Sequence, residues 1–103
     1  MPIVRVFKTT RCPYCTMAIR FLQEVKKVSV QIEDLTGDME ARRALMEETG
    51  QRTVPQIFIG DTHVGGYDEL RALDRRGELD PLLNREAQPN QSQFFLAFET
   101  SPS

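Results

Sequence analysis

The chain has 103 residues, and its 13 lysines and arginines against 15 aspartates and glutamates give a net charge of −2. This size predicts a single domain, and the charge balance argues against nucleic-acid partners and against a polybasic membrane-binding patch. No apolar run approaches the roughly 20 residues of a membrane span, and no charged and apolar leader precedes the first predicted strand, so we expect a cytoplasmic protein.

The first half of the chain predicts two strands and two helices. Residues 3–7 are strand-like, and residues 13–27 carry a helical apolar stripe at Ala18, Phe21, Leu22 and Val25. Residues 28–33 alternate apolar and polar side chains, which predicts a strand with one buried face. Asp38 is expected to cap a helix that ends at Gly50 and turns inward Ala41, Ala44, Leu45 and Met46.

The second half begins with an apolar strand over residues 56–59, followed by a Gly60-Asp61 turn and a short hairpin strand over 62–64. Asp68 is expected to cap a third helix that ends at Gly77, and residues 79–83 add a final helical turn or two. This order of elements predicts the α/β class, with helices packed on a four-stranded mixed sheet.

The last residues differ in composition from the rest. Glutamine, proline, asparagine and serine surround the aromatic cluster at residues 94–98. We predict a domain over residues 1–86 and a flexible extension over 87–103. A partner-binding peptide is the less favoured interpretation of this extension.

The only two cysteines, Cys12 and Cys15, stand at the start of the first predicted helix. Pro13 suits the first helical turn, and the unpaired N–H groups and dipole at a helix N-terminus favour a thiolate at Cys12. In such positions the pKa of a cysteine falls from about 8.5 to roughly 3.5–7.5. Cys15 lies one turn further on the same face, so the pair predicts a redox-active disulfide.

Other uses of two cysteines fit less well. A structural zinc site needs four ligands, and only His63 could join the cysteines, so we expect no metal. A c-type haem would need histidine after the second cysteine, where the chain has Thr16. A structural disulfide across so short a loop would restrict the unfolded chain little, and two inert buried cysteines remain an alternative. His63 is predicted to be a surface residue of the hairpin rather than a catalyst.

Three segments together resemble the glutaredoxin family, specifically its short dithiol bacterial type. They are Cys12-Pro13-Tyr14-Cys15, residues 53–59 and residues 65–70, and the likeness covers about residues 2–84. The resemblance implies a thioredoxin-like fold and a cis Val54–Pro55 bond beside the cysteines. It also implies glutathione as co-substrate.

The glutathione site implied by this resemblance surrounds Cys12. The backbone of Val54 would pair with the cysteinyl part, the helix start at Tyr67 and Asp68 would hold the γ-glutamyl part, and Arg42 would reach the glycine carboxylate. The full implied set is Arg11, Tyr14, Arg42, Thr53, Val54, Pro55, Gly66, Tyr67 and Asp68. The family usually has lysine three residues before the nucleophile, where this chain has Thr9, and Lys8 and Arg11 are the candidate substitutes.

These observations predict a glutathione-dependent thiol–disulfide oxidoreductase with Cys12 as nucleophile and Cys15 as resolving thiol. Its partners would be glutathione, disulfide-containing or glutathionylated proteins and, through glutathione disulfide, glutathione reductase. An alternative is a carrier in which Cys12 of two chains and two glutathiones ligate one [2Fe–2S] cluster. Further alternatives are a binding module without turnover and a redoxin coupled to thioredoxin reductase.

Overall fold

The computed structural model describes residues 2–85, so the predicted extension over 87–103 lies outside the described part. The strands are β1 (Val4–Lys8), β2 (Val30–Asp34), β3 (Gln56–Ile59) and β4 (Thr62–Gly65). The helices are α1 (Pro13–Arg20) with its π-helical continuation η1 (Phe21–Val25), α2 (Met39–Thr49), α3 (Tyr67–Arg75) and α4 (Leu79–Asn84). None of the described helices combines the length and apolarity of a membrane span.

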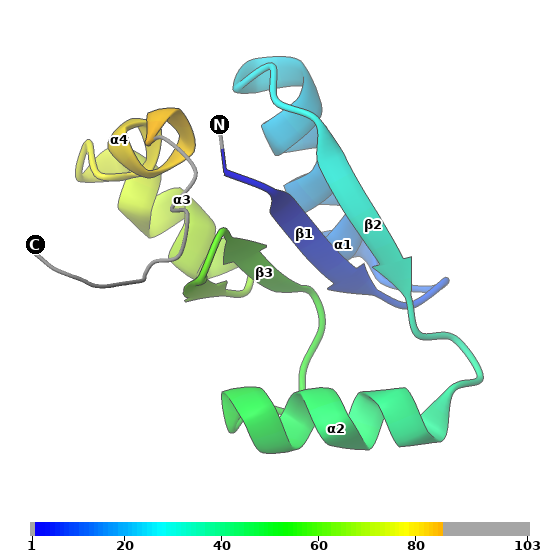
Figure 1. Ribbon diagram of the computed structural model, residues 1–103. Helices are drawn as coiled ribbons and strands as arrows, with labels where there is room; N and C mark the ends of the chain where they lie inside the picture. The colour runs from blue at the N-terminus through cyan, green and yellow to red at the C-terminus, as the bar shows by residue number, and fades with distance from the viewer. Residues whose placement is uncertain (1, 86–103) are drawn as a thin grey trace, which may run out of the picture.

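The four strands form one mixed sheet in the order β2-β1-β3-β4 (Figure 1). β1 pairs with β2 in parallel and with β3 antiparallel, and β3 continues through the hairpin into β4. The α/β architecture with a four-stranded mixed sheet is therefore confirmed. The helix ends are also as predicted for α2, because an Asp38 oxygen accepts the N–H of Ala41 at 3.0 Å and Gly50 is left-handed at φ 72°.

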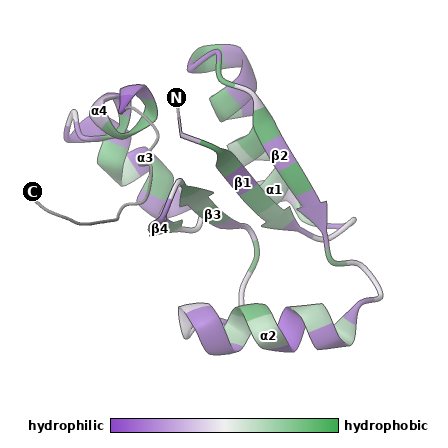
Figure 2. Ribbon diagram, viewed as in Figure 1, coloured by the Kyte–Doolittle hydropathy of each residue, from purple (hydrophilic) through white to green (hydrophobic). Residues whose placement is uncertain are grey.

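The central strands supply apolar side chains to both faces of the sheet. Figure 2 shows β1 largely in the green of hydrophobic residues. Alternate residues on a strand point to opposite faces. On one face the sheet packs against α1, η1, α3 and α4, and the buried residues there are Val4, Val6, Ala18, Phe21, Leu22, Val28, Ile57, Ile59, Leu70, Leu79 and Leu83. On the other face α2 covers a smaller cluster of Leu35, Leu45 and Phe58.

The first helix buries Ala18, Phe21 and Leu22 of its predicted apolar stripe but not Val25, because its last part is a π-helix. The N–H of Lys26 bonds the carbonyl of Phe21 five residues back, at 3.0 Å. This wider turn holds more residues than an α-helical turn and rotates the residues that follow. Val25 is consequently 62% exposed, whereas Lys26 turns inward and pairs with Asp74 at 2.6 Å and Asp80 at 2.9 Å.

Two further burial predictions are wrong. Ile32 on β2 is 45% exposed, because β2 is an edge strand that pairs only with β1. Ala44 on α2 is exposed, since the small cluster beneath this helix accepts only Leu45 and part of Ala41. Both errors come from assuming that every apolar residue on a regular face meets a partner.

Candidate active site

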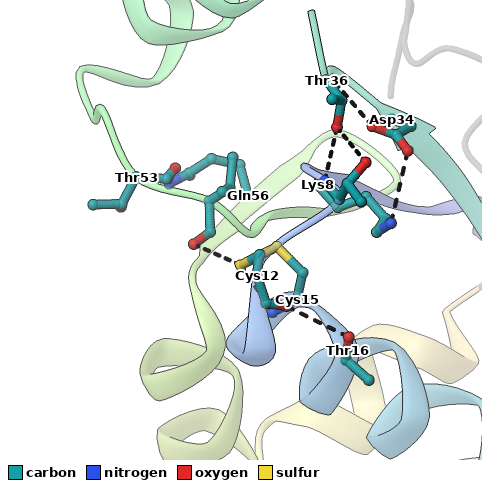
Figure 3. Close-up of a disulfide and its surroundings, with 10 residues drawn as sticks. Lys8, Cys12, Cys15, Thr16, Asp34, Thr36, Thr53 and Gln56 are labelled. Carbon is teal, nitrogen blue, oxygen red and sulfur yellow. Dashed lines mark hydrogen bonds and ion pairs between the residues drawn. A yellow bond between two sulfur atoms is a disulfide. The ribbon is translucent and has the colours of Figure 1, made fainter.

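Cys12 and Cys15 form a disulfide at the N-terminus of α1, with their Cα atoms 5.2 Å apart (Figure 3). Cys12 is the N-cap residue, Pro13 is in the first turn as predicted, and the backbone N–H of Cys15 donates to the Cys12 sulfur at 3.1 Å. Cys12 is half-buried, whereas Cys15 is fully buried. Cys12 is thus the more accessible sulfur and also the one that receives a helix N–H.

The loop before β3 passes beside these sulfurs. The Val54–Pro55 peptide bond is cis, as the resemblance implies, and the Val54 carbonyl oxygen lies 3.5 Å from the Cys12 sulfur. In Figure 3, Thr53 and Gln56 lie on one side of the disulfide, and Lys8 and Asp34 lie on the other. An extended peptide that paired with the backbone of Val54 would therefore run next to Cys12.

A groove of about 320 Å³ opens along this loop. It is lined by Tyr14, Thr53, Val54, Pro55, Gly66, Tyr67, Asp68 and Glu69, and all of these except Glu69 belong to the predicted set. The rings of Tyr14 and Tyr67 lie 6.1 Å apart between centroids, tilted by 35°. Segments far apart in the chain thus contribute to one groove.

The N-terminus of α3, which lines the groove, begins at a different N-cap residue from the one predicted. Gly66, not Asp68, is the N-cap, and its N–H donates to Glu69 Oε1 at 2.7 Å. Gly65, with φ at 108°, lets the chain turn from β4 into this cap. Asp68 is exposed in the first turn, so its carboxylate is turned to solvent at the positive end of the helix.

Arg71 contacts Tyr67, which lines the groove, and no role was predicted for Arg71 from the sequence. Its Nη1 donates to the Tyr67 hydroxyl at 2.7 Å, and its guanidinium carbon lies 4.6 Å from the centroid of the Phe21 ring. Its Nε is buried and has no hydrogen-bond partner among the described residues. The spacing of Tyr67 and Arg71, four residues apart on a helix, is the signal that could have identified this pair.

The basic residues of the predicted set do not line the groove. Arg42 projects from α2 into a separate hollow, and Arg11 is exposed in the loop before α1. Lys8 pairs with Asp34 at 3.7 Å, on the far side of the disulfide from Thr53 (Figure 3). Hydrogen bonds from Thr36, together with the charge of Lys8, hold the pKa of Asp34 below its usual value.

His63 is half-buried rather than a free surface residue. Its Nε2 lies 2.6 Å from Gln56 Oε1, and its ring stacks on Phe58 at 4.9 Å between centroids. Because these contacts tie it into the hairpin, they indicate a structural role. Within residues 2–85, no group of three or more potential ligands is arranged to hold a metal ion.

A mixed four-stranded sheet with helices on both faces, carrying paired cysteines at a helix N-terminus beside a cis-proline, defines a thioredoxin-like thiol–disulfide oxidoreductase. A model of the glutaredoxin family matches residues 4–64. The glutaredoxin of Pseudomonas aeruginosa is 49% identical over 84 residues, which cover 82% of this chain and 99% of that one. Glutaredoxin 3 of Escherichia coli K12 is 45% identical over 83 residues, which cover 81% of this chain and 99% of that one.

A solved structure agrees with these sequence relatives. The crystal structure of the buckwheat glutaredoxin–glutathione complex matches with a TM-score of 0.71 and 38% identity, over 80% of this chain and 76% of that chain. The chain therefore belongs to the glutaredoxin family.

Proposed function

We propose that this chain is a glutathione-dependent oxidoreductase that reduces glutathione mixed disulfides and protein disulfides. The observation that carries the proposal is the groove beside Cys12, which joins the Val54 backbone to the N-terminus of α3. The similar buckwheat protein was crystallised as a complex with glutathione, which supports the same ligand here.

Glutathione has two carboxylates and one ammonium group, which need separate partners. In the proposed complex the cysteinyl part pairs with Val54, and the N–H groups of Tyr67 and Asp68 receive the γ-glutamyl carboxylate. The exposed Asp68 carboxylate binds the ammonium. Arg42 and Arg11 approach the glycine carboxylate from outside the groove.

The proposed reaction on a glutathionylated protein has two steps. The Cys12 thiolate attacks the glutathione sulfur, the protein leaves as a thiol after taking up a proton, and Cys12 is left joined to glutathione. A second glutathione, as its thiolate, then attacks this mixed disulfide and releases glutathione disulfide and the Cys12 thiolate. Glutathione reductase returns the glutathione disulfide to thiol form.

On a protein disulfide, both cysteines take part in the proposed reaction. The Cys12 thiolate forms a mixed disulfide with one sulfur of the substrate, and the Cys15 thiolate then attacks Cys12 and releases the reduced substrate. The burial of Cys15 supports this division of roles, because it leaves Cys12 as the sulfur that a large substrate can reach. Two glutathiones then reduce the Cys12–Cys15 disulfide.

Turnover of a small glutathione mixed disulfide, coupled to glutathione reductase, tests the proposal. We expect the parent protein and Cys15→Ser to be active and Cys12→Ser to be inactive. Absence of glutathione-dependent turnover by the parent protein would overturn the proposal. Activity retained in Cys12→Ser would overturn the assignment of the nucleophile.

A further inference from the structure

One face of α2 is not used by the core. Met39, Arg42, Arg43 and Met46 stand at spacings of three, four and seven residues, so they share one face of the helix. With Glu40 and Arg52 they line a hollow of about 660 Å³, separate from the groove beside Cys12. We call the surface formed by Met39, Arg42, Arg43, Met46 and Arg52 the Met–Arg surface.

The Met–Arg surface is positively charged on a chain whose net charge is −2. Its three guanidinium groups are accompanied in the hollow by a single carboxylate, that of Glu40. Within residues 2–85 none of the three arginines forms an ion pair, so no carboxylate of the described chain neutralises them. Charge complementarity therefore favours an acidic partner.

The two methionines give the same surface an apolar component. Met39 is 75% exposed, and Met46 is half-buried and also lines the hollow. Unbranched thioether side chains adapt to partners of different shapes, which is why methionine is common on binding surfaces that accept several ligands. The surface thus fits an apolar side chain flanked by carboxylates.

The hollow adjoins the groove through the chain itself. Arg52 lines the hollow, and its neighbour Thr53 lines the groove beside Cys12. Figure 1 shows the segment after α2 rising from that helix toward β3. An extended peptide advances about 3.3 Å per residue, so one held at Val54 would reach Arg52 within a few residues of its reactive cysteine.

We propose that the Met–Arg surface binds the segment next to the reactive cysteine of protein substrates and selects segments that carry carboxylates and a large apolar side chain. This inference rests on the proposed function, since it assigns that activity a substrate class. It places substrate choice on α2 and leaves the reacting sulfurs in the groove.

Matched peptides that each contain one internal disulfide test the inference, because the Cys12 thiolate then attacks the peptide itself and glutathione does not occupy Val54. They share two cysteines and one leucine and carry either aspartates or lysines beside the cysteines. At low ionic strength we expect kcat/KM to be about tenfold higher for the acidic peptide, and we expect added salt to shrink this difference. Arg43→Gln should lower kcat/KM for the acidic peptide about threefold to tenfold, and Met39→Ser should lower it less.

A matched control separates local charge from net charge. Arg75→Gln removes an exposed arginine from the end of α3, outside the hollow, and should leave the peptide preference unchanged. Turnover of a small glutathione mixed disulfide should be the same in the parent protein, Arg43→Gln and Arg75→Gln. Equal kcat/KM for the acidic and basic peptides would overturn the inference, and so would an equal loss in the two arginine variants.

Binding of the same peptides with serine in place of cysteine separates this inference from the proposed function. If the small mixed disulfide is not turned over but the acidic peptide still binds in an Arg43-dependent way, the proposed function fails and the docking surface stands. Failure of the acidic peptide to bind more tightly than the basic one would overturn the docking surface. A dimer in light scattering that Arg43→Gln dissociates would assign the surface to a second copy and overturn the inference.

Discussion

The two faces of the sheet differ in how much they bury. On the face covered by α1, η1, α3 and α4, core residues such as Leu22, Ile57 and Leu70 are fully buried. On the α2 face, Leu35, Leu45 and Phe58 are each still 6–8% exposed. Cys15 is fully buried, and α3 lies on the face with the larger core. The better-packed side therefore holds the reacting groups in place. On the α2 side the core needs fewer residues, so one face of the helix is free for recognition.

A matched pair of leucine truncations, one on each face, should show the largest difference between the two faces, measured as the loss in free energy of unfolding. We expect Leu22→Ala to lower the free energy of unfolding by about 3–5 kcal/mol and Leu45→Ala by about 2 kcal/mol, because only Leu22 leaves a cavity enclosed on all sides. Urea denaturation of both variants measures the difference. An equal or larger loss for Leu45→Ala would show that the α2 face is as tightly packed as the other.

Loss of the contact between Arg71 and Tyr67 should have an intermediate effect, and we expect it to weaken substrate binding. Arg71→Met removes the hydrogen bond that orients Tyr67, so we expect the KM for a glutathione mixed disulfide to rise about threefold to tenfold, with a smaller change in kcat. Tyr67→Phe should raise KM through loss of the same bond. Steady-state kinetics of both single variants and the double variant measure these effects.

The double variant decides whether Arg71 acts as a positioning residue. If it acts through Tyr67, adding Tyr67→Phe to Arg71→Met will cost little more than either change alone. Additive losses would contradict this role. Arg71→Lys, which keeps a charge without the planar fork of donors, should restore only part of the affinity.

The smallest expected effect is at the edge strand. The lowered pKa of Asp34, caused first by its hydrogen bonds from Thr36 and then by Lys8, means that the ionised carboxylate stabilises the folded state. This stabilisation is present above the usual pKa of 3.8 and is lost as the pH falls through the lower folded value. Asp34→Asn should therefore lower the urea midpoint slightly at about pH 7, and this loss should shrink as the pH falls below 3.8 and through the lower folded pKa. A loss independent of pH would contradict the charge-based explanation.

The sequence predicted the elements well where one local signal dominates. Asp38 and Gly50 mark the ends of α2, and the Gly60-Asp61 turn marks the hairpin. Most of the groove was also predicted, because motifs carried by the resemblance mark it on three separate segments. The structure brings those segments together around Cys12.

The errors share one cause, which is that periodicity does not specify a partner. The stripe through Val25 assumes an α-helical period. In the π-helix η1, Lys26 instead of Val25 faces inward, where it pairs with Asp74 on α3 and Asp80 on α4. The cap assigned to Asp68 belongs to Gly66, where the reciprocal bond comes from Glu69. The spacing of Arg71 and Tyr67 could have indicated their pairing, but the contact of Arg71 with Phe21 depends on how α3 packs against η1.

The most direct test of the account is where glutathione becomes attached. Each of the parent protein, Cys12→Ser and Cys15→Ser is reduced, exposed to glutathione disulfide and measured by intact mass and peptide mapping. Because Cys12 is the accessible sulfur and Cys15 is buried, we predict one glutathionyl group on Cys12 of Cys15→Ser and none on Cys12→Ser. Rapid attachment to Cys15 in Cys12→Ser, as fast as to Cys12 in the other variant, would contradict the account.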